Sequence, residues 1–269
     1  MATVALHSAS TGLSALSTQI DVIANNLSNV NTTAFKGSRV NFEDLLYQEK
    51  RQPGVENANG DNRPAGINVG LGVKVANTDR DFTQGSAVET GRQLDVMIEG
   101  DGFFAVDILQ ELGDGIGYTR AGNFFVNAEG DLVLGNSQGP RVLPEINVPE
   151  DAMSIDISAD GRVFATLPGD PEPEEVGQLE LVNFINPNGL RAIGGNIYVE
   201  TEAAGPPIDG IPGEAGLGTL QQGFLESSNV DPVRELVSLI KAQRAFEMNS
   251  QTIQAADESL QVVANLRRF

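Results

Sequence analysis

The chain has 269 residues, a net charge of −20 and no cysteine. Disulfides and thiolate metal sites are therefore excluded, and the acidity disfavours nucleic acid and anionic membrane surfaces, because both are bound through Lys and Arg. Hydrophobic content of 40% with 20% charged residues is typical of a folded protein. There is no membrane-length apolar run, and the N-terminus lacks the basic start and apolar stretch of a secretory signal peptide.

The first thirty residues carry apolar side chains at alternating spacings of three and four residues, which is typical of helices that pack against helices. The repeat consists of Leu6, Ala9, Leu13, Leu16, Ile20, Ile23, Leu27 and Val30. Its outer positions are mostly Ser, Thr, Gln, Asn and Ala, which lose water more cheaply than charges do. A helical hairpin that caps a globular domain is one interpretation, but the uncharged outer face favours assembly with other chains.

Four asparagines lie within seven residues near the expected end of this helix. Asparagine is a poor helix former, and its amide needs hydrogen-bond partners. One interpretation is local capping of the last turn. The other is that the amides fix the register between subunits, as single buried asparagines do in coiled coils. The residues are Asn25, Asn26, Asn29 and Asn31.

The middle of the chain differs from both ends. Residues 31–230 hold 31 acids against 12 bases, so nearly the whole charge excess lies there. Segment 48–72 has the composition of an extended arm or mobile loop. The apolar period then changes to two, which predicts strands, and Glu129-Gly130 and Asp160-Gly161 predict hairpin turns. The expected strand segments are 94–108, 122–135, 154–167, 176–184 and 195–201.

The last forty residues return to the spacing of the first thirty. Asp231-Pro232 provides an aspartate cap and a proline at the first helical position. The repeat is Leu239, Ala242, Phe246, Asn249, Ile253, Ala256, Leu260 and Val263. The sequence thus predicts an α+β fold, in which long coiled-coil-type N- and C-terminal helices flank a β-rich central domain and the helical part is discontinuous in sequence.

No group of residues predicts catalysis, a cofactor or a metal. The acidic run at 169–175 lacks the spacing of a calcium loop, and there is no nucleophile elbow or phosphate-binding loop. The many acids leave an acid–base hydrolase open by residue type, but they fall in turns and exposed strand positions. We therefore expect a protein that is not an enzyme.

Long motifs resemble the bacterial flagellar rod and hook proteins, in the family's order and over nearly the whole chain. They are GLSALSTQIDVIANNLSNVNTTAFKG (12–37), IEGDGFFAV (98–106), YTRAGNFFVNAEGDLVL (118–134), VGQLELVNFINPNGL (176–190), QGFLESSNVD (222–231) and LIKAQRAFEMNSQTI (239–253). Departures from the family pattern are mild: Ser28 replaces the usual alanine, Ala34 the common glycine and Phe246 the usual tyrosine.

Within the family, the chain resembles the distal rod subunits most. The stretch that resembles them and distinguishes them from hook subunits includes Phe42, Leu45, Tyr47, Gln48, Arg51, Pro53 and Gly54. A hook or proximal rod subunit is the alternative. From another class, a secreted β-rich carbohydrate-binding protein or glycosidase would need sugar-stacking aromatics, whereas the chain has no Trp and three Tyr.

The resemblance implies a structural subunit that self-assembles into a helical tube, which transmits torque and conducts exported flagellar proteins. The implied partners are copies of the chain, neighbouring rod and hook proteins, rod-surrounding ring proteins and the flagellar type III export apparatus, with no nucleic acid and no membrane insertion. The implied location is the basal-body rod crossing the periplasm to the outer membrane, reached without a cleaved signal peptide. Phe42 and Leu46 fit the Phe-x-x-x-hydrophobic pattern of early export substrates; ordinary packing is the alternative.

We expect four regions. Residues 1–33 form an inner helix, 34–75 a rod-specific arm, 76–224 a β-rich outer domain, and 225–269 a helix that pairs with the first. The expected subunit interface is Leu6, Leu13, Leu16, Ile20, Ile23, Asn25, Asn26, Leu27, Asn29, Val30, Asn31, Leu239, Phe246, Ile253, Leu260 and Val263.

Overall fold

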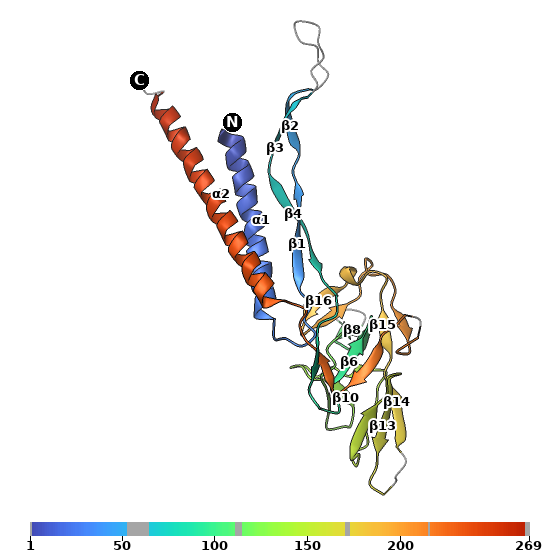
Figure 1. Ribbon diagram of the computed structural model, residues 1–269. Helices are drawn as coiled ribbons and strands as arrows, with labels where there is room; N and C mark the ends of the chain where they lie inside the picture. Colours follow the sequence, from blue (N-terminus) through green and yellow to red (C-terminus); the bar gives the residue numbers. More distant parts are fainter. Residues whose placement is uncertain (1, 53–64, 111–114, 170–172, 215, 267–269) are drawn as a thin grey trace. The chain divides into compact units, whose positions relative to one another are not determined.

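A computed structural model describes residues 2–52, 65–110, 115–169, 173–214 and 216–266 (Figure 1). The chain divides into two compact units, each discontinuous in sequence. We call residues 1–28, 38–80 and 231–269 the helix–ribbon unit, and residues 29–37 and 81–230 the β unit. This division differs from the expected regions, because the segment after the first helix belongs to the β unit and the arm groups with the helices.

Two long helices dominate the helix–ribbon unit. Helices α1 (Ala2–Ser28) and α2 (Pro232–Leu266) lie side by side and antiparallel (Figure 1). At 1.5 Å per residue they are about 40 Å and 52 Å long. The predicted cap of α2 is confirmed, since Asp231 Oδ1 accepts hydrogen bonds from the backbone N–H groups of Val233 (2.9 Å) and Arg234 (3.3 Å).

The N-terminal helix ends earlier than its apolar repeat predicts. It stops at Ser28, whereas the repeat extends to Val30. The backbone then turns, with the N–H of Thr32 donating to the carbonyl of Asn29 (3.1 Å) and the N–H of Phe35 to that of Thr32 (3.2 Å). Asparagine and threonine favour such turns because their side chains compete for backbone hydrogen bonds.

A two-stranded ribbon completes the helix–ribbon unit, where the sequence predicted an arm. Its first part pairs β1 (Ser38–Asp44) with β4 (Val73–Arg80), in a register that shifts between Asn41 and Phe42. Its second part pairs β2 (Tyr47–Arg51) with β3 (Ile67–Gly70). Most of its side chains are exposed, so the burial alternation that reveals a strand in sequence is weak here.

The β unit is built from antiparallel pairs. Its largest sheet has seven strands in the order β16-β17-β8-β7-β15-β18, with β11 beside β7. These strands are β7 (Phe103–Asp107), β8 (Ile116–Thr119), β11 (Val142–Leu143), β15 (Leu181–Asn183), β16 (Arg191–Gly194), β17 (Ile197–Val199) and β18 (Ile208–Gly210). A short 3₁₀ helix, η2 (Pro187–Gly189), precedes β16.

Smaller sheets surround this one. The three-stranded sheet contains β12 (Ser154–Ile157), β13 (Arg162–Thr166) and β14 (Glu174–Gln178). The two-stranded pairs are β5 (Ala87–Glu89) with β20 (Phe224–Glu226), β6 (Val96–Glu99) with β19 (Thr219–Gln222), and β9 (Phe124–Val126) with β10 (Leu132–Leu134). The hairpins predicted at Glu129-Gly130 and Asp160-Gly161 are confirmed.

Each face of the seven-stranded sheet has its own core. Successive side chains of a strand point to opposite faces. Phe104, Val106 and Leu181 therefore join the larger hydrophobic cluster, whereas Phe103 and Val182 join the aromatic cluster on the other face. Within the described residues, neither helix is both long and apolar enough to span a membrane.

Candidate assembly site

The predicted apolar repeats of the two terminal helices are buried to different extents. On α1, Ala9 and Ile23 are each 5% exposed. On α2, Ala242 is 3% exposed, whereas Phe246 and Leu260 each keep 38% of their surface in solvent. Other interface positions are half-buried: Leu6, Leu13, Leu16, Ile20, Leu27, Leu239 and Ile253. The Val263 side chain lies outside the described residues. A single chain therefore covers these repeats only in part.

Glycine allows the helices to approach closely where the α2 repeat is polar. A Cβ atom added at Gly12 would lie 3.1 Å from the side-chain nitrogen of Asn249, the polar member of the α2 repeat. A larger side chain at residue 12 would push that amide away. The polar residue of the α2 repeat, Asn249, thus faces a glycine, Gly12, on α1.

A second apolar surface on α2 is exposed. Val233 is 68% exposed, Ile240 52%, and Leu236 and Val237 are close to half exposed. These four residues, which we call the α2 stripe, recur at helical spacing over the first two turns. A cluster of exposed large apolar side chains is typical of a protein–protein contact surface.

Another side of α1 contacts the ribbon, which helps to explain why this helix carries so little charge. The Thr11 hydroxyl accepts a hydrogen bond from the Val73 N–H (3.4 Å), and the Ser8 hydroxyl donates to the Gly70 carbonyl (3.4 Å). Gly72 has φ +122°, and an added Cβ would lie 2.1 Å from Thr11 Oγ1. Small polar side chains fit this narrow contact, whereas a charge would be desolvated at a cost.

Asn26 is engaged inside its own chain. It is 2% exposed, and its amide bonds both backbone groups of Ser38, donating to the carbonyl (2.8 Å) and accepting from the N–H (2.9 Å). Its nitrogen also lies 3.4 Å from Glu235 Oε1. Burial raises the pKa of Glu235, although the Asn26 hydrogen bond opposes this. Asn26 therefore ties the start of the ribbon to α1 and to the first turn of α2.

The other three asparagines differ from Asn26. Asn25 and Asn31 are exposed, and Asn29 is half-buried. The side chain of Asn29 accepts a hydrogen bond from the Thr32 hydroxyl (3.1 Å), so it takes part in the turn that follows α1. Because Asn25 and Asn31 are exposed, their amides can contact another chain, as the register hypothesis requires.

The end of the same motif enters a buried ion cluster in the β unit, which sequence reasoning missed. The cluster consists of Lys36, Arg120 and Glu226. Lys36 Nζ lies 2.6 Å from Glu226 Oε1, and Arg120 Nε donates to Glu226 Oε2 at 2.9 Å. All three side chains are nearly inaccessible to solvent. The partners are far apart in sequence, although each lies in a family motif.

Further hydrogen bonds complete the cluster. Lys36 Nζ also donates to the Thr83 carbonyl (2.7 Å), and the Gly85 N–H donates to Glu226 Oε1 (2.8 Å). Burial alone would raise the pKa of Glu226, but Arg120 and Lys36 outweigh it and hold the pKa below its usual range. Burial lowers the pKa of Lys36, an effect that Glu226 opposes. The carboxylate is thus held ionised between two cations.

The remaining predicted residues lie on the ribbon. Phe42 is 40% exposed in β1, and Leu46 is 83% exposed just before β2. Tyr47, Gln48 and Arg51 are exposed on β2, while Leu45 is half-buried. Pro53 and Gly54 lie outside the described residues.

Three family models match this chain. Residues 6–36 match "Flagella basal body rod protein", residues 97–165 match "Flagellar hook protein FlgE/F/G D1 domain", and residues 221–266 match "Flagellar basal body rod FlgEFG protein C-terminal". The first match ends at Lys36 and the last includes Glu226. Two members of the ion cluster thus lie in matched regions near the two ends of the chain.

Curated relatives match nearly the full length. The flagellar basal-body rod protein FlgG of Borreliella burgdorferi is 47% identical over 98% of each chain. FlgG of Agrobacterium fabrum is 45% identical, covering 97% of this chain and 98% of its own. FlgG of Buchnera aphidicola from Schizaphis graminum is 44% identical, covering 95% and 96%.

Proposed function

This chain belongs to the flagellar basal-body rod and hook protein family, and we propose that it is a structural subunit of the distal rod that assembles with copies of itself. The distal rod assignment is supported by relatives named FlgG that align over nearly the whole chain. Because this is a family of structural rod proteins, the chain is not an enzyme. The comparisons do not favour a hook subunit or a carbohydrate-binding protein.

The exposed α2 stripe is the observation that carries the self-assembly proposal. Fully burying an apolar side chain of this size stabilises a complex by about 1.5–3 kcal/mol. Val233, Leu236, Val237 and Ile240 are close to half exposed or more in the single chain. Neighbouring copies would cover this stripe and the partly exposed repeat at Phe246 and Leu260.

In the assembly we propose, the two helices form an inner coiled-coil wall and the β-rich middle an outer layer. Helices α1 and α2 would supply the wall, the ribbon the rod-specific arm and the β unit the outer domain, with the bounds of the two units in place of the expected 1–33, 34–75, 76–224 and 225–269. Alternating spacing over both helices supports this. The exposed asparagines, Asn25 and Asn31, and the half-buried Asn29 would set the register between copies.

The finer partners and the route are also proposals. They are the type III export apparatus, the rod-surrounding ring proteins, and a position across the periplasm reached without a cleaved signal peptide. Phe42 and Leu46 are the export-signal candidates. Phe42 is 40% exposed and Leu46 is 83% exposed, so neither side chain is fully packed within the single chain. Basal-body rod localisation itself follows from the relatives.

Charged substitutions in the α2 stripe test the self-assembly proposal. We expect the double variant Leu236→Asp/Ile240→Asp to stay folded, because both side chains are exposed, and to lose polymerisation. A matched control is Met153→Asp/Ile185→Asp, which changes two exposed apolar side chains of the β unit. Sedimentation and electron microscopy would measure assembly. Polymers of the stripe variant at the wild-type critical concentration would contradict the proposal.

A further inference from the structure

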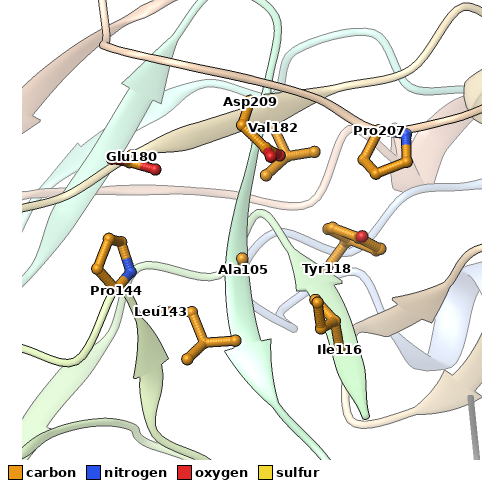
Figure 2. A pocket seen from close by; sticks show the side chains of 9 residues that line it. All are labelled: Ala105, Ile116, Tyr118, Leu143, Pro144, Glu180, Val182, Pro207 and Asp209. Atoms are coloured by element: carbon orange, nitrogen blue, oxygen red, sulfur yellow. The ribbon is translucent and has the colours of Figure 1, made fainter. Parts of the chain in front are cut away.

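One face of the seven-stranded sheet carries a hollow of about 230 Å³. Register explains it, because Ala105 pairs with Tyr118 on one side and with Leu143 on the other. The small alanine side chain therefore leaves a gap between two large neighbours. Figure 2 shows the nine lining side chains around this gap: Ala105, Ile116, Tyr118, Leu143, Pro144, Glu180, Val182, Pro207 and Asp209.

The hollow combines apolar walls with two acids. Val182 pairs with Asp209, so both side chains share this face, and Glu180 lies two residues before Val182 on the same side. Both acids are exposed, and neither forms an ion pair with a described residue. The volume falls below the roughly 300–1,000 Å³ of small-molecule pockets. A single side chain with an apolar stem and a cationic head, Lys or Arg, fits such a site.

The β unit has no cation to spare for these acids. It contains 25 acids against six bases. Two of the bases, Lys36 and Arg120, are buried with Glu226. Arg92, Arg141 and Arg162 pair with nearby acids. The sixth base, Arg191, also has an interaction within the chain. A cation that meets these two acids would therefore come from outside the β unit.

The helix–ribbon unit presents cations of the right kind. Its bases nearly match its acids, 11 against 12. Lys50 and Arg51 are exposed on β2, and Lys241 and Arg244 are exposed on α2. None of these four forms an ion pair with a described residue. In an assembly of identical chains, each copy offers both the cations and the acidic hollow.

We propose that the hollow at Ala105 receives a lysine or arginine side chain from a neighbouring copy of this chain. The stem packs on Leu143, Pro144 and Pro207, and the cationic head meets Glu180 and Asp209. This inference rests on the self-assembly proposed above. It adds a contact that lets strongly acidic β units lie beside other copies.

Neutralising the two acids gives a sharp test. We expect Glu180→Gln/Asp209→Asn to raise the critical concentration for polymerisation roughly threefold to tenfold, as loss of two partly exposed ion pairs would. The matched control Glu200→Gln/Glu202→Gln removes the same charge at exposed positions outside the hollow. If only overall repulsion matters, both variants should assemble more readily than the wild type, and the inference fails.

A second variant tests the shape of the hollow without changing charge. Ala105→Leu should fill the gap and weaken polymerisation, while the melting temperature stays close to that of the wild type. Unchanged assembly would overturn the inference. Failure of the wild type itself to polymerise would instead overturn the proposed self-assembly, so the two failures are distinguishable.

Charge exchange identifies the incoming side chain. The reversal Glu180→Lys/Asp209→Lys should block polymerisation. Adding Lys50→Glu/Arg51→Glu, or separately Lys241→Glu/Arg244→Glu, should restore it in one of the two cases. If neither combination restores polymerisation, the described cations of a neighbouring copy do not occupy the hollow and the inference fails.

Discussion

The two units bury their side chains to very different extents. In the β unit, Phe104, Phe124 and Ile98 are completely buried. All of the largest fully buried side chains among the described residues lie in this unit. In the helix–ribbon unit the buried apolar residues are mostly alanines, with Ile23 and Val40 the largest. The first unit has a core of its own, whereas the second leaves much of its apolar surface for other molecules to cover.

Charge follows the same division. The β unit carries a net charge of −19 and the helix–ribbon unit −1. An acidic surface around a complete core resists non-specific association. A nearly neutral surface with exposed apolar stripes favours contact. One chain thus contains an adhesive region and a self-sufficient one.

The most destabilising of the substitutions should be one in the ion cluster of the β unit. Glu226→Gln leaves Lys36 and Arg120 buried with no compensating charge, and should cost about 3–5 kcal/mol of unfolding free energy. Hydrogen exchange, read by peptide, should show the loss in the β unit. Glu175→Gln, at an exposed acid, is the control and should change stability by about 0.5 kcal/mol or less. A loss below about 1 kcal/mol for Glu226→Gln would contradict the buried arrangement.

The next largest loss of stability should be confined to the helix–ribbon unit. Gly72→Ala combines φ +122° with a clash against Thr11, and should cost about 1–3 kcal/mol. Faster exchange in α1 and β4 would report it. Gly91→Ala is the matched control, because Gly91 has φ +69° and an added Cβ meets nothing within 4 Å. Equal losses for the two variants would argue against the helix–ribbon contact.

Alanine substitutions of the neighbouring residues Asn25 and Asn26 should differ in their effect on the free energy of unfolding. Asn26→Ala leaves both backbone groups of Ser38 without their side-chain partner, and should cost about 1–2 kcal/mol in the separate chain. Asn25→Ala should change the stability of the separate chain by about 0.5 kcal/mol or less. Chemical denaturation measures both. Adding Asn29→Ala to Asn25→Ala tests register, since polymerisation at wild-type yield would remove that hypothesis.

The smallest effect is a pH dependence. Because the folded-state pKa of Glu226 is lowered, its contribution is fully present above the unfolded pKa of about 4.3 and is lost as pH falls through the folded value. The stability difference between wild type and Glu226→Gln should therefore narrow below about pH 4. Denaturant titrations across pH 3–7 would measure it. A constant difference over this range would show that the carboxylate is not held ionised by its neighbours.

Local patterns predicted the helices, the hairpins and the α2 cap, because each depends on residues close in sequence. The apolar repeat extends to Val30, but the helix ends at Ser28, because the asparagine and threonine residues that follow form turns. In sequence the ribbon resembles an irregular arm, because its exposed strands show little apolar alternation. The ion cluster depends on a contact between residues 36 and 226 that no local pattern contains. The hollow depends on strand register, which places Ala105 between Leu143 and Tyr118.

The chain passes between the two units four times, at 28/29, 37/38, 80/81 and 230/231. Helix α1 therefore packs against α2, a segment more than two hundred residues later in the sequence. The β unit likewise needs Glu226, which lies 190 residues after its partner Lys36. Each unit is thus completed only by a segment far along the sequence from its first one, and contacts of such large sequence separation slow folding.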